Sequence, residues 1–324
     1  MAPTGPPPSR GRKVLRRVVA ALFLVFVAVL VVGQWDQVRS LLGRLSVAAV
    51  AAATAAVAAG HLATFLSWRA VLADLGSPLP PAAGGRVFFL GQLGKYLPGS
   101  IWPAVTQMEL GRDYQVPRRT SAAAVAITML LAVGSGLLVA VVLLAVVGAE
   151  VPGPYRWAAV VLPLAVLVAA PPVLNRLLGL ALRLARRPPL PAPLSVAGAL
   201  QASAWMLAAW LCYGVQVWVL ARQVGVAGGP ALLLRSIGAF AGAWCAGFLL
   251  VAAPAGAGAR EGALILLLGP SIGRPQATVI GVVSRLAFLA ADLGLAAVAA
   301  LAGRSGGRRL MGGGAFDDQV GEQG

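Results

Sequence analysis

The sequence predicts an all-α polytopic membrane protein with about six full spans, two re-entrant helical hairpins and an inverted repeat. The 324-residue chain is 59% hydrophobic and only 11% charged, whereas a soluble domain carries about 25% charged residues. Long apolar runs without charge recur along it, as expected of membrane-spanning helices. Two of these runs are broken by Pro and Gly, which a membrane tolerates only where protein or a water-filled cavity surrounds the backbone.

The formal net charge of +16 comes from basic residues at the ends of apolar runs. Such charge in a soluble protein would indicate nucleic acid, but this pattern is typical of helix orientation and of contact with anionic headgroups. We therefore expect membrane lipids as partners and no nucleic acid, and the sequence identifies no protein partner. The distribution of Lys and Arg predicts a multi-pass protein of the cell membrane with both termini in the cytoplasm.

The first part of the chain is expected to hold a tail and two spans. Residues 1–17 are Pro-rich and then basic, which predicts a disordered cytoplasmic tail. The apolar run Val18 to Val32 has no small-x-small cleavage site after it, so a retained first helix is favoured over a removed signal. A second span is predicted at about Leu45 to Trp68. It contains His61, the only histidine, for which packing is favoured over metal binding because no second His or Cys is nearby.

The first broken region, Gly91 to Arg112, holds Lys95, one of only two lysines. The apolar segments on either side of Pro98-Gly99 are each too short for a span, which needs about 20 residues. Two half-helices that meet at Pro98-Gly99 therefore predict a re-entrant hairpin on the cytoplasmic side.

The rest of the chain alternates in the same way. A basic, Pro-rich stretch from Arg176 to Pro193 predicts an inner loop. A second broken region, Ala231 to Gly269, is interrupted by Pro254 to Glu261. The remaining spans are predicted at about Thr120–Val147, Trp157–Val173, Leu194–Leu220 and Gln276–Leu301.

We expect one transmembrane domain over residues 18–302, with halves of about 18–150 and 157–302, and a disordered cytoplasmic tail over 303–324. The order span, span, re-entrant segment, span occurs twice, and an odd number of crossings inverts the second half. Paired broken segments at matching positions point to a transport site. The alternative is chance, because any polytopic protein rich in Gly and Pro can be cut into similar halves.

Charges inside the membrane are expected to face each other or a wet cavity, because each costs about 2.5–3.5 kcal/mol on insertion scales. Basic side chains there suit a phosphate headgroup, and acidic ones balance charge or bind a cationic headgroup. Arg285 and Asp292 are seven residues apart and share a helix face. Structural salt bridges and snorkelling are the alternatives. The candidate substrate-binding residues are Lys95, Tyr96, Pro98, Gly99, Glu109, Arg112, Gly256, Gly258, Arg260, Glu261, Arg285 and Asp292.

No catalytic site, cofactor or metal site is expected, so the protein is not predicted to be an enzyme. The chain has one His, no Cys-His pairing and no nucleotide-binding loop. Gly134-Ser135-Gly136 lies inside an apolar span and is interpreted as a packing motif rather than a nucleophile turn. Cys212 and Cys245 lie inside apolar runs and are interpreted as small core residues.

Two motifs together resemble the lysylphosphatidylglycerol synthase transmembrane family. They are Gly94-Lys95-Tyr96-Leu97-Pro98-Gly99-Ser100-Ile101-Trp102 and Pro254-Ala255-Gly256-Ala257-Gly258-Ala259-Arg260-Glu261. The closing Ser284-Arg285-Leu286, followed by Asp292, also looks like the last helix of that family. The resemblance covers about residues 15–302. It implies the flippase-like membrane region only, because no cytosolic aminoacyl-transfer domain accompanies it.

The sequence departs from this family after the first motif. Many members continue directly into a Gly-Glu pair, where this chain has Ser100-Ile101-Trp102-Pro103 and no acid before Glu109. The first hypothesis is a translocator of a phospholipid or lipid-linked substrate. The alternatives are a non-transporting scaffold of a lipid or polysaccharide biosynthetic complex and, with least support, an integral membrane transferase.

Overall fold

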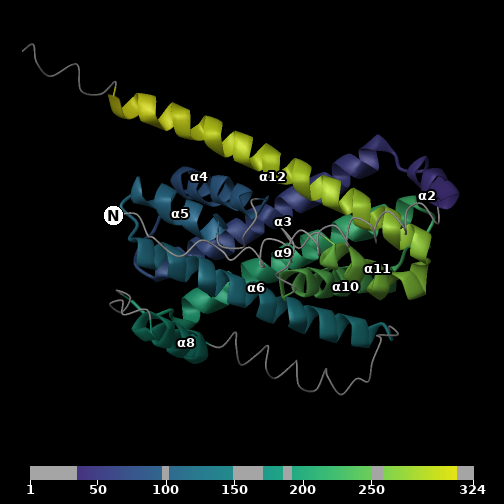
Figure 1. Ribbon diagram of the computed structural model, residues 1–324, viewed down its shortest axis with the longest axis horizontal. Coiled ribbons are helices and arrows are strands. Elements are labelled where there is room, and N and C mark those ends of the chain that lie inside the picture. Colours follow the sequence, from purple (N-terminus) through teal and green to yellow (C-terminus); the bar gives the residue numbers. More distant parts are fainter. Residues whose placement is uncertain (1–34, 97–101, 149–170, 185–191, 250–257, 312–324) are drawn as a thin grey trace, which may run out of the picture.

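The computed structural model describes residues 35–96, 102–148, 171–184, 192–249 and 258–311. Within these ranges the regular elements are all helices (Figure 1). The helices are α2 Trp35–Leu42, α3 Val47–Asp74, α4 Pro81–Gln92, the 3₁₀ turn η1 Leu93–Tyr96, α5 Trp102–Arg112, α6 Arg118–Val146, α8 Pro171–Leu184, α9 Val196–Gln223, α10 Pro230–Leu249, α11 Ala259–Ile272 and α12 Arg274–Met311.

Five of the described helices are long and apolar enough to cross a membrane. They are Val47–Asp74, Arg118–Val146, Val196–Gln223, Pro230–Leu249 and Arg274–Ala302. This confirms an all-helical, polytopic membrane protein. Four of the six predicted spans correspond to α3, α6, α9 and α12. The predicted span Val18–Val32 lies outside the described residues, and the predicted span Trp157–Val173 enters them only at its end.

The fifth of these helices, α10, covers the apolar part of the second predicted broken region, ahead of the predicted interruption at Pro254 to Glu261. It has 20 residues and is long enough to cross a membrane by itself. The re-entrant form predicted for this region stays a prediction. The turns of both predicted hairpins, with Pro98, Gly99 and Gly256, lie outside the described residues.

Two boundaries differ from the prediction. Helix α8 occupies the first part of the expected inner loop, and it is held by Asn175, whose amide bonds both the N–H and the C=O of Leu194 at 2.9 Å. Leu174 beside it is buried, so this stretch packs rather than loops. Helix α12 continues to Met311, past the predicted end at Leu301, because no proline interrupts it.

The two halves of the chain show matching local structure. Helices α3 and α9 each have 28 residues and begin after a serine cap, Ser46 or Ser195. The serine hydroxyl oxygen accepts a hydrogen bond from the backbone N–H three residues later in the chain. The interval from Ser46 to Pro81, which starts α4, equals the interval from Ser195 to Pro230, which starts α10.

The packing of the helices matches as well. Helix α3 runs along α9, α4 packs against α12, and α10 packs against α6, so each half covers the last long helix of the other. Figure 1 shows α4 and α5 toward one end of the bundle and α10 and α11 toward the opposite end.

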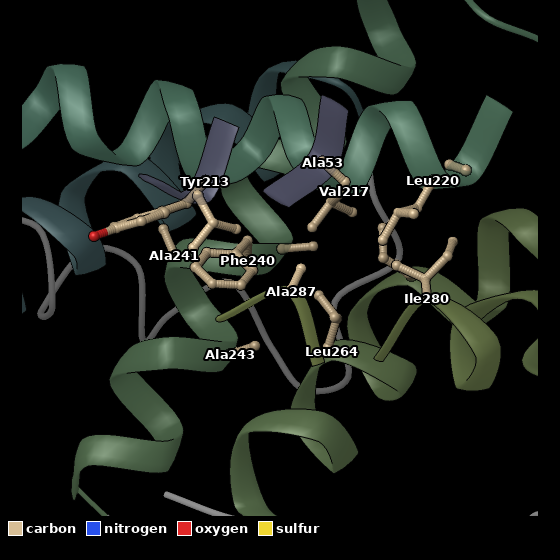
Figure 2. Packing of buried hydrophobic residues seen from close by; sticks show 14 of the residues in the cluster. Ala53, Tyr213, Val217, Leu220, Phe240, Ala241, Ala243, Leu264, Ile280 and Ala287 are labelled. Carbon is tan, nitrogen blue, oxygen red and sulfur yellow. The ribbon is translucent and has the colours of Figure 1, made fainter. Parts of the chain in front are cut away.

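The centre of the bundle is an aromatic and aliphatic core around Tyr213 and Phe240 (Figure 2), and Phe288 belongs to the same cluster. The rings of Phe240 and Phe288 stack with centroids 5.4 Å apart. Gly60 lets α3 approach α9, because a Cβ there would collide with the Tyr213 ring. Helices α3, α9, α10 and α12 thus meet at one point, and the polar residues described below surround it.

Candidate substrate-binding site

The first motif reaches the core through the short turn η1. Gly94 lies directly against the start of α5, where a Cβ would be 2.8 Å from the carbonyl carbon of Trp102. Only glycine permits this approach without displacing backbone. On the other side, α4 is fixed to α3 by Phe65, Trp68, Phe88 and Phe89, whose ring centroids lie 5.3–6.3 Å apart. The turn therefore presents Lys95 and Tyr96 to α12.

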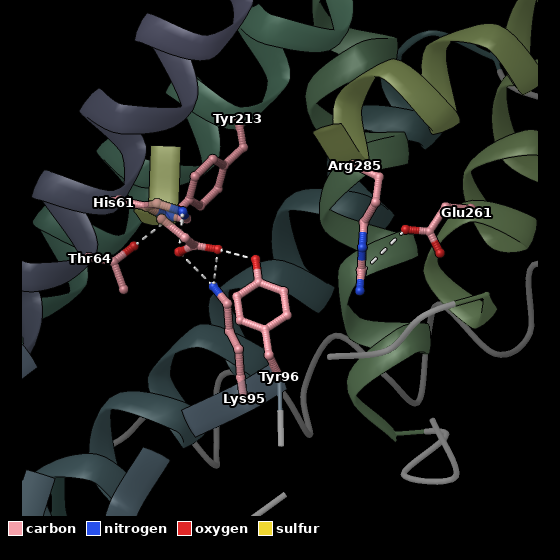
Figure 3. A network of polar contacts seen from close by, with 8 residues as sticks. His61, Thr64, Lys95, Tyr96, Tyr213, Glu261 and Arg285 are labelled. Carbon is pink, nitrogen blue, oxygen red and sulfur yellow. Dashed lines mark hydrogen bonds and ion pairs between the residues drawn. The ribbon is translucent and has the colours of Figure 1, made fainter. Parts of the chain in front are cut away.

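The carboxylate of Asp292 on α12 contacts three side chains, Lys95, Tyr96 and His61, and with them forms what we name the Asp292 centre (Figure 3). Lys95 Nζ lies 2.8 and 2.7 Å from the two carboxylate oxygens. Tyr96 Oη donates to Oδ2 at 2.6 Å, and His61 Nε2 lies 3.0 Å from Oδ1. The Asp292 side chain is only 4% exposed, so its charge is balanced by the Lys95 ammonium and the Tyr96 hydroxyl rather than by solvent.

His61 connects this centre to the crossing of α3 and α9. Its Nδ1 lies 2.8 Å from Tyr213 Oη, which is 3.0 Å from Thr64 Oγ1. Thr64 follows Ser46 at the same interval at which Tyr213 follows Ser195. Two equivalent positions of the two halves therefore meet beside the Asp292 centre.

The second motif forms the Glu261 centre, which consists of Glu261, Arg260 and Arg285. Glu261 Oε1 lies 3.5 Å from Arg260 Nε and 3.5 Å from Arg285 Nη1. Its other oxygen accepts a 2.6 Å bond from the N–H of Gly258, which starts α11 with φ +99°, a backbone conformation that favours glycine. Glu261 thus caps the helix and pairs with two arginines, of which Figure 3 shows Arg285.

Arg260 is the most enclosed cation of the two centres, with a side chain 9% exposed. Its guanidinium lies 4.5 Å from the Phe288 ring centroid and 5.5 Å from that of Phe240, which stabilises a desolvated cation. Its Nη2 is buried and has no hydrogen-bond partner among the described residues. Phe288 also meets His61 edge-on at 5.3 Å, so this ring separates the two centres.

Helix α12 joins the two motifs, because Asp292 meets the first and Arg285 meets the second. The predicted shared face of Arg285 and Asp292 is what allows this. We name Lys95, Arg260, Glu261, Arg285 and Asp292 together the buried seam. Three cations and two carboxylates leave it with one excess positive charge.

Glu109 and Arg112 do not join the buried seam, contrary to their place among the candidate residues. Glu109 pairs with Arg118 at 2.6 Å and with Arg112 at 3.4 Å, and the side chains are 50%, 57% and 61% exposed respectively. The reason is that α5 ends at Arg112, which places both residues at the end of the helix. The hydrogen bond from Arg118 lowers the pKa of the Glu109 carboxyl. We name Glu109, Arg112 and Arg118 the Glu109 cluster.

Sequence reasoning missed three polar residues of the site, which are His61, Thr64 and Tyr213. His61 was assigned to packing, but it contacts the most buried carboxylate. A usable signal was the spacing of His61 and Thr64, one turn apart on one face of an Ala-rich helix.

The described residues contain no group of three or more His, Cys, Asp and Glu suited to a metal ion. The carboxylates of both centres are already paired with cations. The unused capacity lies in donors, above all Arg260 Nη2. The arrangement therefore suits an anionic ligand.

Residues 15–296 match the family model described as "Lysylphosphatidylglycerol synthase TM region". No curated protein and no solved structure matches the chain.

Proposed function

The chain belongs to the lysylphosphatidylglycerol synthase TM region family, and from this premise we propose that it is a flippase-like protein that binds and translocates a phospholipid or lipid-linked substrate. In this proposal it lies in the cell membrane with both termini in the cytoplasm, acts on membrane lipids and performs no catalysis. The proposed ligand group is the headgroup phosphate.

The observation that carries this proposal is the unused hydrogen-bonding capacity of Arg260 within a buried seam of excess positive charge. Leaving a buried donor without a hydrogen-bond partner lowers stability by about 1–3 kcal/mol, and by more when the donor is charged. A phosphodiester supplies one negative charge and several acceptor oxygens, which suit a guanidinium fork. Arg260 also lies in the first turn of α11, where the helix dipole favours an anion.

The paired arrangement of the halves supports translocation rather than binding alone. The segments that follow α3 and α9 lie toward opposite ends of the bundle and meet α12 at the two centres (Figure 1). Inverted repeats that surround a midplane site are the common design of secondary transporters. Opening at one end and then at the other would expose the seam to each leaflet in turn.

The test is reconstitution of the purified full chain into phosphatidylcholine liposomes with a trace of tail-labelled fluorescent phosphatidylglycerol. Dithionite bleaches only the outer leaflet, so translocation appears as bleaching beyond that fraction. We expect wild-type protein to translocate the label. Arg260→Gln should slow it by about tenfold or more, because a hydrogen bond to a charged group contributes about 1.5–3 kcal/mol.

The matched control is Arg222→Gln, which changes an exposed arginine at the end of α9. It should translocate at the wild-type rate. If folded wild-type protein moves neither phosphatidylglycerol nor phosphatidylcholine, the translocator proposal fails and a scaffold role is favoured. If a headgroup is transferred without movement of lipid between leaflets, the transferase alternative is favoured.

A further inference from the structure

The Asp292 centre contains one ring nitrogen whose hydrogen bonding is incomplete. His61 Nε2 is buried and makes no aligned hydrogen bond with the described residues, although it lies 3.0 Å from Asp292 Oδ1. The other ring nitrogen, Nδ1, lies 2.8 Å from Tyr213 Oη. The bonds beyond Tyr213 decide which nitrogen carries hydrogen.

Thr64 Oγ1 donates its single hydrogen to the carbonyl oxygen of Gly60 at 2.9 Å. It therefore accepts the hydrogen of Tyr213 Oη, 3.0 Å away. Tyr213 then has no hydrogen left for His61, so Nδ1–H donates to Tyr213 Oη. His61 is thus the Nδ1–H tautomer, and Nε2 presents a lone pair beside a carboxylate, which is a place for one proton.

While Lys95 is paired with Asp292, the positive charge around the His61 ring opposes its protonation. The guanidinium of Arg260 is stacked on Phe288, which also contacts the His61 ring. Glu261 and Arg285 lie beyond Arg260 in the Glu261 centre. The charged and titratable groups nearest to the His61 ring are Lys95 and Tyr96 of η1, Tyr213 of α9, Arg260 of α11 and Asp292 of α12.

Lys95 is the cation paired with Asp292, and it is more accessible to a ligand than the carboxylate is. The Lys95 side chain is 24% exposed, against 4% for Asp292. If a phosphate pairs with the Lys95 ammonium, the buried Asp292 carboxylate loses its cation. A buried carboxylate without a cation is strongly destabilising, so a second cation is needed. Nε2 of His61, at 3.0 Å, is placed to supply that cation once it is protonated.

We propose that binding of an anionic phospholipid, through its phosphate, by Lys95 is coupled to the uptake of one proton by the His61–Asp292 pair. A zwitterionic phospholipid such as phosphatidylcholine adds no net negative charge and therefore draws in no proton. The proton comes from a hydronium ion in the water that reaches the site, and one N–H bond forms at Nε2. The ion pair of Lys95 with Asp292 is replaced by that of His61 with Asp292. One negative and one positive charge enter together, so the net charge of the site is unchanged.

This inference rests on the proposed function, because the phosphate headgroup is the ligand that takes Lys95. It adds the proton as a second ligand of the same site. Where one proton is taken up per lipid, lipid affinity rises by up to about tenfold for each pH unit of acidification. A proton gradient across the membrane would then bias the side on which lipid is bound.

Histidine nitrogen NMR tests the inference directly, because His61 is the only histidine in the chain. Full-length protein with a histidine-free purification tag is labelled with ¹⁵N-histidine and placed in lipid nanodiscs. In phosphatidylcholine alone at neutral pH, we expect a protonated Nδ1 and an unprotonated Nε2. With phosphatidylglycerol at the same pH, the Nε2 signal should move to the protonated position.

Two variants isolate the coupling. Lys95→Met should give the doubly protonated ring without phosphatidylglycerol, because Asp292 has lost its other cation, and Lys95→Gln serves if the first variant does not fold. Tyr213→Phe removes the acceptor of Nδ1–H and should abolish the single-tautomer pattern. Arg222→Gln, at an exposed site, should behave as wild type.

The outcomes separate this inference from the proposed function. An Nε2–H tautomer in phosphatidylcholine would overturn the inference, because the hydrogen-bond chain would then run from Thr64 toward Asp292. A ring that stays unprotonated at Nε2 while phosphatidylglycerol is translocated would overturn the coupling and leave the proposed function intact. A ring that responds to phosphatidylglycerol without any translocation would support coupled binding and overturn only the flippase proposal.

Discussion

The Asp292 centre and the Glu109 cluster each place one carboxylate between basic groups, yet their surroundings are opposite. The Asp292 side chain is 4% exposed, and its nearest cation is 2.7 Å away. The Glu109 side chain is 50% exposed, and its nearest cation is 2.6 Å away. The contact distances hardly differ, so burial is what separates the two groups.

This difference shows how membrane proteins use charge. A solvated ion pair contributes little, because water and salt screen it. Removing one member of a buried pair strongly lowers stability, because the remaining charge is left in a medium of low dielectric. Contacts of equal length are therefore expected to have very different consequences when they are broken.

The largest expected effect is that of Asp292→Asn. The change keeps the size of the side chain but leaves the Lys95 ammonium without its counter-charge. We expect the free energy of unfolding to fall by about 3–5 kcal/mol, the usual consequence of breaking a buried pair. Reversible SDS titration of the purified protein, followed by tryptophan fluorescence, measures this change.

The double variant Lys95→Met/Asp292→Asn is the control for this prediction. Removing both charges should restore most of the lost stability, because no buried charge then lacks a partner. If the double variant is as unstable as the sum of the two single variants, the pair is not energetically coupled. The buried pair would then behave like an exposed one, and burial would not explain the expected difference between the Asp292 centre and the Glu109 cluster.

The sequence predicts the helical membrane fold and the chemistry of the buried charges, but not which charges meet. Apolar runs predict α3, α6, α9 and α12 to within a few residues at most ends, because burial in a bilayer needs a fixed length of apolar helix. The pair Lys95 and Asp292, by contrast, is separated by 197 residues. No local pattern encodes such a contact, which depends on how α4 packs against α12.

The differences between the predicted and the observed positions of these residues have local physical causes. Glu109 and Lys95 lie in one broken region, but η1 turns Lys95 inward while α5 carries Glu109 outward. His61 was interpreted as a packing residue because one polar group in an Ala-rich helix does not reveal which face is buried. The packing of α12 against α3 brings His61 to Asp292, and the close approach of α3 to α9 at Gly60 brings it to Tyr213.

A smaller effect is expected for Glu261→Gln, in the second buried centre. Its two arginine contacts are 3.5 Å long, and glutamine can still accept the bond from the N–H of Gly258. The expected loss is about 1–3 kcal/mol, the range for hydrogen bonds to charged groups. The same SDS titration measures this loss. A loss as large as that of Asp292→Asn would show that removing the carboxylate charge lowers the free energy of unfolding equally in both centres.

The smallest effect is expected for Glu109→Gln, which tests the exposed side of the comparison. Because Arg118 lowers the pKa of Glu109 in the folded protein, its carboxylate stabilises the fold above the unfolded-state pKa. That contribution is lost as the pH falls through the lowered value. At neutral pH the melting temperature should fall only slightly, and below about pH 4 the difference from wild type should shrink.

In 1 M salt, where the Debye length is about 3 Å, the difference from wild type should vanish for Glu109→Gln but persist for Asp292→Asn. A salt-independent loss at Glu109 would mean that this cluster is enclosed, and burial would no longer explain the contrast between the two carboxylates.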